Sequence, residues 1–154
     1  MLDRLKAPRR LTRDVADLVH HHMFDLENNA KEKAVIRRLN LLGREQFLRL
    51  ADLREADFAG SGMDHPADSA GKWRQVLDDL ERGQAPFTPA DLAVSGDDLM
   101  RELHMKPGPA LGDLLSKLLE YAQLRPSQNN YKSLIKYAKI LGAGSAGADR
   151  SASD

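Results

Sequence analysis

A proline-framed turn between two helical segments constrains the fold of this 154-residue chain more than any other feature. The turn reads Lys106-Pro107-Gly108-Pro109. Proline fixes φ and has no amide hydrogen, so it suits the first position of a helix and is excluded from a helix interior. Asp97 and Asp98 favour the start of the preceding helix, because acidic side chains stabilise a helix N-terminus. The turn therefore predicts that one helix ends before it and that another begins at Pro109.

The residues after the turn carry an apolar stripe with the helical period. Its members are Leu111, Leu114, Leu115, Leu118, Leu119 and Ala122. Residues three and four positions apart share one face of a helix, so this face is predicted to be buried. Gly108 and Gly112 lack side chains beside it, where another backbone or a phosphate group could approach closely.

The whole chain is predicted to be all α, with about seven helices in two packed subdomains. No segment alternates β-branched with polar residues, as a half-buried strand would. The predicted parts are a basic arm at 1–10, a helical subdomain at 11–83, a linker at 84–95, a helix-turn-helix with a last helix at 96–141, and a disordered tail at 142–154. The linker is predicted from Pro86 and Pro89, and the tail from its lack of large apolar residues.

The composition excludes several classes of protein. Lys plus Arg and Asp plus Glu are equal at 23 each, so the molecule is no polycation and a nucleic-acid interface must be local. There is no cysteine, which excludes disulfides and thiolate metal sites and fits the cytoplasm, where we expect this protein to act. The longest apolar runs are only a few residues long, so we expect no contact with a membrane.

A local basic surface is predicted near the end of the chain. Lys132, Lys136 and Lys139 are spaced four and three residues apart, so they form one stripe on the last helix. Lys106 stands at the proline turn, where the free amides near Gly108 add positive potential. These groups would hold phosphates of a structured RNA by its shape and backbone. A solvated helix face without a ligand is the alternative interpretation.

Several residues around the turn resemble a segment of a known family. Gly96, Asp98-Leu99, Lys106-Pro107-Gly108-Pro109 and Gly112-Asp113-Leu114-Leu115 resemble the segment near the C-terminal end of bacterial CCA-adding enzymes and poly(A) polymerases, the tRNA nucleotidyltransferase family. The segment of this chain is similar to the part of those enzymes that binds the acceptor arm and elbow of tRNA. The resemblance therefore implies a helical body and tail that binds tRNA or a related RNA without catalysis and without a cofactor.

The catalytic head of that family has no counterpart here. Nucleotidyl transfer needs carboxylates on a strand for divalent metal ions, beside a Gly-Ser turn for the triphosphate. Gly60-Ser61-Gly62 has suitable residue types but follows a predicted helix. We therefore expect no enzyme activity from this chain alone. It would be a fragment, a shortened gene product or a stand-alone relative, and a separate nucleotidyltransferase head or a second copy could be its partner.

Three consecutive histidines, His20 to His22, suggest a metal site. Successive residues of a helix point about 100° apart, so three in a row cannot all face one ion. The segments 19–24 and 50–58, which contain the candidate ligands His21, His22 and Asp57, resemble the second half of the HD phosphohydrolase region, but the upstream His-Asp pair of that superfamily is missing. We expect no metal here. An HD-like metal-dependent phosphohydrolase remnant and a helical protein-interaction module remain the alternative functions.

Overall fold

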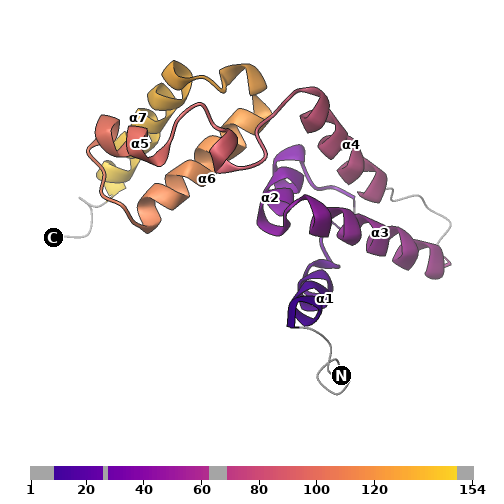
Figure 1. Cartoon of the computed structure of the whole chain (residues 1–154). Coiled ribbons are helices and arrows are strands. Elements are labelled where there is room, and N and C mark those ends of the chain that lie inside the picture. Colours follow the sequence, from indigo (N-terminus) through magenta and orange to yellow (C-terminus); the bar gives the residue numbers. More distant parts are fainter. Residues whose placement is uncertain (1–8, 26–27, 63–68, 149–154) are drawn as a thin grey trace. The chain divides into compact units, whose positions relative to one another are not determined.

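The computed structural model describes residues 9–25, 28–62 and 69–148. These residues form seven α-helices and no strand, which confirms the predicted all-α fold (Figure 1). In chain order the helices are α1 (Arg9–His21), α2 (Glu32–Leu42), α3 (Arg44–Gly60), α4 (Ser69–Arg82), α5 (Gly96–Leu103), α6 (Pro109–Leu124) and α7 (Tyr131–Ala148). Two short 3-10 helices, η2 (Pro89–Asp91) and η3 (Pro126–Gln128), lie in the connections before α5 and α7.

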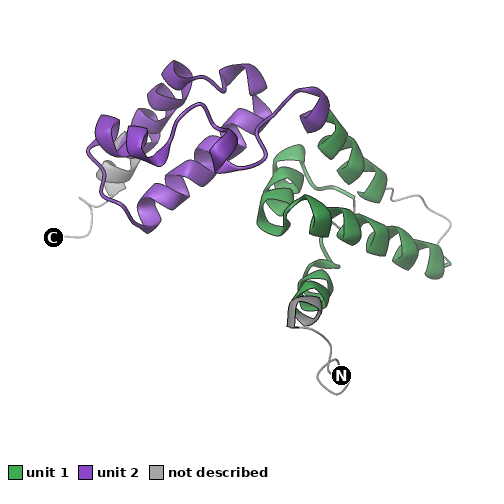
Figure 2. Ribbon diagram, viewed as in Figure 1, with its two compact units in different colours: residues 1–79 green, residues 80–154 purple. Residues whose placement is uncertain are grey.

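The chain divides into two compact units, residues 1–79 and residues 80–154 (Figure 2). In the first unit, the fully buried Trp73 packs against the aromatic rings of Phe24 and Phe47, with centroid distances of 5.2 and 6.2 Å. Its indole N–H donates a hydrogen bond of 3.0 Å to Asp25. A buried indole N–H needs a hydrogen-bond acceptor, so Asp25 allows the Trp73 ring to be buried without leaving its N–H unpaired.

Ion pairs join the outer helices of the first unit to α3. The guanidinium of Arg74 on α4 lies 2.7 Å from Asp52 and 3.0 Å from Glu55, both on α3. Arg49 on α3 lies 3.4 Å from Asp14 on α1. Each pair has at least one exposed side chain and contributes little on its own, so the buried apolar contacts decide the stability of this unit.

The second unit has its own hydrophobic core. Its buried members are Leu92, Val94, Leu99, Leu111, Leu114, Leu118, Leu119, Ala122, Leu134, Ile135 and Ala138. Five of the six positions in the predicted stripe of α6 belong to this core, while Leu115 is only partly buried. α6 begins at Pro109, as the proline turn predicts. The helical period therefore placed the buried face of α6 correctly.

The segment 84–95, which we expected to be a linker, contributes to this core. Leu92 and Val94 are buried with the side chains of α6 and α7. The side chain of Asn129 accepts a hydrogen bond from the amide of Ala93 and donates one to the carbonyl oxygen of Asp91, both at 3.0 Å. These contacts fix the segment against the connection between α6 and α7.

The ends of the terminal helices differ from the predicted arm and tail. α1 begins at Arg9, within the expected basic arm, and residues 1–8 lie outside the described part. α7 continues to Ala148, past the start of the expected disordered tail, and residues 149–154 are not described. Gly142 lies so close to α5 that a Cβ atom there would be 3.6 Å from the side chain of Leu103, so α7 still has a packing partner at this point.

Candidate nucleic-acid interface

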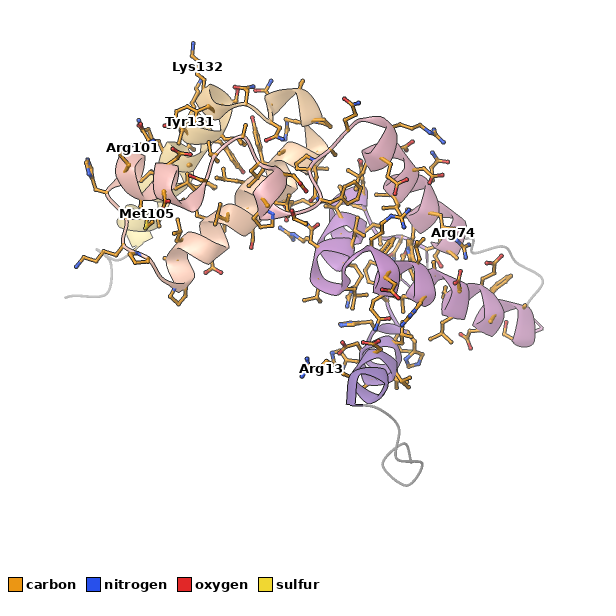
Figure 3. The ribbon with its side chains drawn as sticks, in the orientation of Figure 1. Arg13, Arg74, Arg101, Met105, Tyr131 and Lys132 are labelled. Carbon is orange, nitrogen blue, oxygen red and sulfur yellow. The ribbon has the colours of Figure 1, made fainter. Side chains whose placement is uncertain are left out.

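The predicted stripe of Lys132, Lys136 and Lys139, which we call the lysine row, lies on the exposed face of α7. Lys132, Lys136 and Lys139 are all exposed, whereas Leu134 and Ala138 on the opposite face are fully buried. Figure 3 shows Lys132 projecting away from the helix. One face of α7 is buried in the core, so the residues on the opposite face of the helix remain in contact with water.

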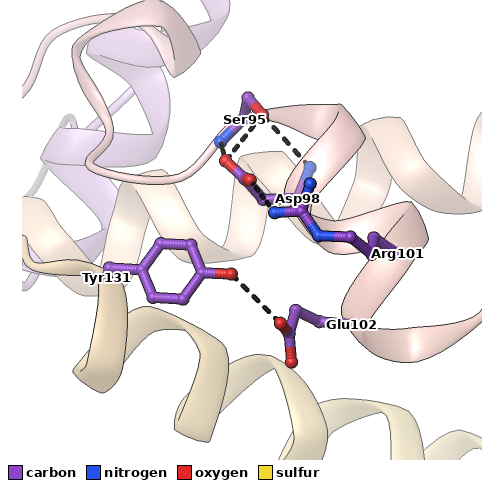
Figure 4. A network of polar contacts seen from close by, with 5 residues as sticks. All are labelled: Ser95, Asp98, Arg101, Glu102 and Tyr131. Atoms are coloured by element: carbon purple, nitrogen blue, oxygen red, sulfur yellow. Dashed lines mark hydrogen bonds and ion pairs between the residues drawn. The ribbon is translucent and has the colours of Figure 1, made fainter.

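The three lysines differ in their ion pairs. The Nζ atom of Lys139 lies 3.6 Å from Oε2 of Glu102 on α5. The other carboxylate oxygen of Glu102 accepts a hydrogen bond of 3.2 Å from the hydroxyl of Tyr131 (Figure 4). Within the described part of the chain, Lys132 and Lys136 have no ion pair or hydrogen bond through their side chains. Two ammonium groups of the row are therefore available to a ligand, and the third is partly neutralised.

A capping box fixes the helix that carries Glu102. The hydroxyl of Ser95 accepts a hydrogen bond from the amide of Asp98 at 3.1 Å, and the amide of Ser95 donates one to the Asp98 carboxylate at 2.9 Å. The pKa of Asp98 is lowered, mainly by the hydrogen bond from the Ser95 backbone amide and next by that from the Ser95 hydroxyl. Asp98 also receives a hydrogen bond from Arg101 (Figure 4). Asp98 thus has a structural role at the start of α5.

The residues predicted at the proline turn do not line the pockets that border the lysine row. Lys106 and Gly108 are exposed, and Gly108 has φ +156° and ψ −174°, a conformation found almost only in glycine. The contact of Leu103 with Gly142 places the end of α5 beside a point on α7 that is about 15 Å along the helix from Lys132 but only about 5 Å from Lys139. Neither Lys106 nor Gly108 lines the pockets described next.

Two pockets border the lysine row. The first has a volume of about 610 Å³ and contains all three lysines, together with Tyr131, Ile135 and Ile140. The second has a volume of about 410 Å³ and lies between α6, η3 and α7. We call it the tyrosine pocket, and its lining includes Tyr121, Gln128, Lys132, Ser133, Lys136 and Tyr137. Lys132 and Lys136 are shared by both pockets.

The tyrosine pair is a feature that we did not predict from the sequence. The rings of Tyr121 on α6 and Tyr137 on α7 are stacked, with a centroid distance of 4.0 Å and an interplanar angle of 19°. The guanidinium carbon of Arg125 lies 5.3 Å from the centroid of the Tyr121 ring. The two tyrosines are sixteen residues apart on different helices, so helical spacing alone gives no signal that they meet.

Comparison with known proteins identifies the family. A family model described as "tRNA nucleotidyltransferase domain 2 putative" matches residues 1–138, which is most of the chain. The chain belongs to this tRNA nucleotidyltransferase family. No curated protein and no solved structure matches it. None of the helices in the described ranges is both long and apolar enough to cross a membrane.

In this member of the tRNA nucleotidyltransferase family, the histidines at the end of α1 contact other groups. A guanidinium N–H of Arg38 donates a hydrogen bond to Nδ1 of His21, and Nδ1 of His22 contacts the carbonyl oxygen of Val19. Burial, and then the positive charge of Arg38, lowers the pKa of His21. A cation at this nitrogen keeps the ring neutral and would repel a metal ion at the same position.

Asp57, the carboxylate that we considered as a third ligand, belongs to a different interaction. It lies 3.7 Å from the guanidinium of the buried Arg54, and its own side chain is exposed. Among the residues that the structure describes, no three histidine, aspartate or glutamate side chains are grouped closely enough to hold a metal ion. The described structure therefore gives the phosphohydrolase alternative no geometric support.

Exposed apolar side chains give the protein-interaction alternative only a small surface. Val19 and Met23 are one helical turn apart near the end of α1 and are 59% and 57% exposed. Leu41 and Ile140 are also exposed, but they belong to different units of the chain. Single exposed apolar residues are common on folded proteins, and a docking surface needs a contiguous patch.

Proposed function

We propose that this chain is a non-catalytic tRNA-binding part of a tRNA nucleotidyltransferase, and that its second unit holds the RNA through the exposed face of α7. The observation that carries this proposal is the pair Lys132 and Lys136. Both ammonium groups are exposed on one helix face, and no carboxylate of the described residues neutralises them. Membership of the family supports tRNA as the class of RNA.

The electrostatics of this face suit a phosphate backbone. The two lysines are four residues apart and so lie about 6 Å apart along the helix axis, which is close to the spacing of successive phosphates in a nucleic-acid strand. Each phosphate contact releases counterions, so binding should weaken as salt increases. Lys139 should contribute less, because a phosphate must compete with Glu102 for its ammonium group.

The chemistry of nucleotide addition would come from another part of the enzyme. Holding two divalent metal ions for that reaction requires paired carboxylates on a rigid element beside a triphosphate-binding turn. In this chain, Gly60 ends α3 and the hydroxyl of Ser61 donates to the carbonyl oxygen of Phe58, so this Gly-Ser turn completes a helix end. Asp98 is engaged in the cap of α5. Neither Gly60-Ser61 nor Asp98 therefore supports a catalytic role for this chain.

Replacing Lys132 and Lys136 together by Gln should weaken tRNA binding by a factor on the order of ten. The slope of log affinity against log salt should decrease by roughly 0.7 to 0.9 for each phosphate contact that is lost. The measurement is a tRNA gel shift at several salt concentrations. Lys139→Gln should have a smaller effect than either of the other single substitutions, because its charge is already paired.

A charge-matched control separates a local site from general electrostatics. The double variant Lys31→Gln and Lys72→Gln removes the same net charge from the first unit. It should leave both the affinity and the salt slope nearly unchanged. Equal losses in the two double variants would show that α7 is not the binding face, and unchanged binding in the α7 variant would refute the proposal.

A further inference from the structure

We propose that the tyrosine pocket binds one unstacked nucleotide of a single-stranded RNA segment. The base would lie against the tyrosine pair, and the phosphate would lie beside Lys132 and Lys136. This inference rests on the proposed function, because the same two lysines take part in both. It adds a site for a base to a surface that otherwise contacts only the RNA backbone.

The two tyrosines line the pocket, and we infer that a base stacks on the ring face of Tyr137 that is turned away from Tyr121. Tyr121 and Tyr137 come from two packed helices and are both only partly buried, although they also contact the core of the second unit. Their mutual stacking and the position of Arg125 near Tyr121 fix the rings before any ligand arrives. Aromatic side chains stack on any base through its π-face, so a fixed ring at a pocket wall favours a planar ligand.

The polar lining favours a ligand that carries negative charge. Lys132 and Lys136 line the pocket, and no carboxylate is among its lining residues. Lys139 and its partner Glu102 are not part of the lining. An anionic group at the pocket therefore meets two lysines without an ion pair among the described residues, and no carboxylate in the lining.

The remaining polar groups suit the edge of a base or a ribose. The side-chain amide of Gln128 and the hydroxyl of Ser133 make no hydrogen bond within the described part of the chain. An amide and a hydroxyl can each donate and accept, as the edges of bases and the ribose 2′-hydroxyl require. The volume of about 410 Å³ falls within the range of sites for small ligands. A single nucleotide is the ligand that combines a planar ring, an anion and such edges.

This inference changes the mode of recognition that we expected. From the sequence we expected RNA to be held by its shape and backbone alone. The stacked pair across α6 and α7 supplies an aromatic surface. An unpaired nucleotide in a loop or at an end of the RNA would fit it, whereas a base inside a duplex would not expose its face.

The test is an NMR titration of the full, ¹⁵N-labelled chain with hexauridine RNA, uridine 5′-monophosphate and inorganic phosphate. Hexauridine and the mononucleotide should shift the amide signals of residues 128–137 in the same pattern, and phosphate alone should shift them less. Tyr137→Leu should weaken hexauridine binding by roughly 5- to 150-fold, as expected for the loss of one stacked base. Tyr137→Phe should bind like the original chain, because it keeps the ring.

Two further variants keep the test decisive if Tyr137→Leu disturbs the fold. Gln128→Ala changes a side chain of η3 outside the core and should weaken hexauridine binding by roughly 2- to 10-fold. Tyr131→Leu is the matched control, because this tyrosine lines the other pocket and not the tyrosine pocket. It should weaken hexauridine binding less than Tyr137→Leu does.

Three results would overturn the inference. One is that inorganic phosphate reproduces the shifts of the mononucleotide, which would show an anion site only. Another is that hexauridine binding is insensitive to both Tyr137→Leu and Gln128→Ala. The third is that an acidic peptide such as hexaglutamate shifts the same amides as strongly as hexauridine, which would indicate a protein ligand. If tRNA binding still depends on Lys132 and Lys136 in the second case, the pocket inference fails and the proposed function stands.

Discussion

At the scale of the residue, Gly108 is required by its backbone conformation, whereas the structure shows no such requirement at Gly112. Gly108 adopts φ +156°, where a side chain is strained, whereas Gly112 lies inside α6 and a Cβ atom there would meet nothing within 4 Å. Gly108→Ala should therefore lower the free energy of unfolding by about 1–3 kcal/mol, and Gly112→Ala should raise it by up to about 1 kcal/mol. Urea unfolding followed by circular dichroism measures both. Destabilisation by Gly112→Ala would contradict the open space seen around this residue.

At the scale of the element, the side chain of Asn129 fixes the segment before α5 to the segment before α7. Asn129→Ala removes the hydrogen bonds to Ala93 and Asp91, so it should destabilise the second unit by about 1–2 kcal/mol and speed hydrogen exchange of the Ala93 amide. Asn130→Ala is the matched control, because it removes the hydrogen bond from the amide of Ser133 at the start of α7. It should also destabilise the unit, without exposing the Ala93 amide. Unchanged exchange at Ala93 in the first variant would refute this role of Asn129.

At the scale of the whole molecule, each unit has a core and a spectroscopic probe of its own. The single tryptophan, Trp73, lies in the first unit, and all three tyrosines lie in the second. Leu118 is fully buried, so Leu118→Ala should destabilise the second unit by about 2–5 kcal/mol and shift the unfolding transition seen by tyrosine signals more than that seen by tryptophan fluorescence. Phe47→Leu, in the first unit, should do the reverse. Equal shifts of both transitions in both variants would show that the units unfold as one.

The sequence alone determined the features that depend on neighbouring residues. The proline turn set the start of α6 at Pro109, and the apolar period identified the buried face of that helix. The same period placed Lys132 and Lys136 on an exposed face. These properties are local, because the backbone geometry of a helix fixes which residues share a face whatever the helix packs against.

Only the tertiary structure decided which distant side chains meet. It paired Lys139 with Glu102, stacked Tyr121 on Tyr137, and brought Arg38 to His21. It also gave the expected linker a place in the core of the second unit. Each of these contacts joins different elements of the chain, so it depends on how whole helices and their connections pack, and no spacing within one helix encodes that.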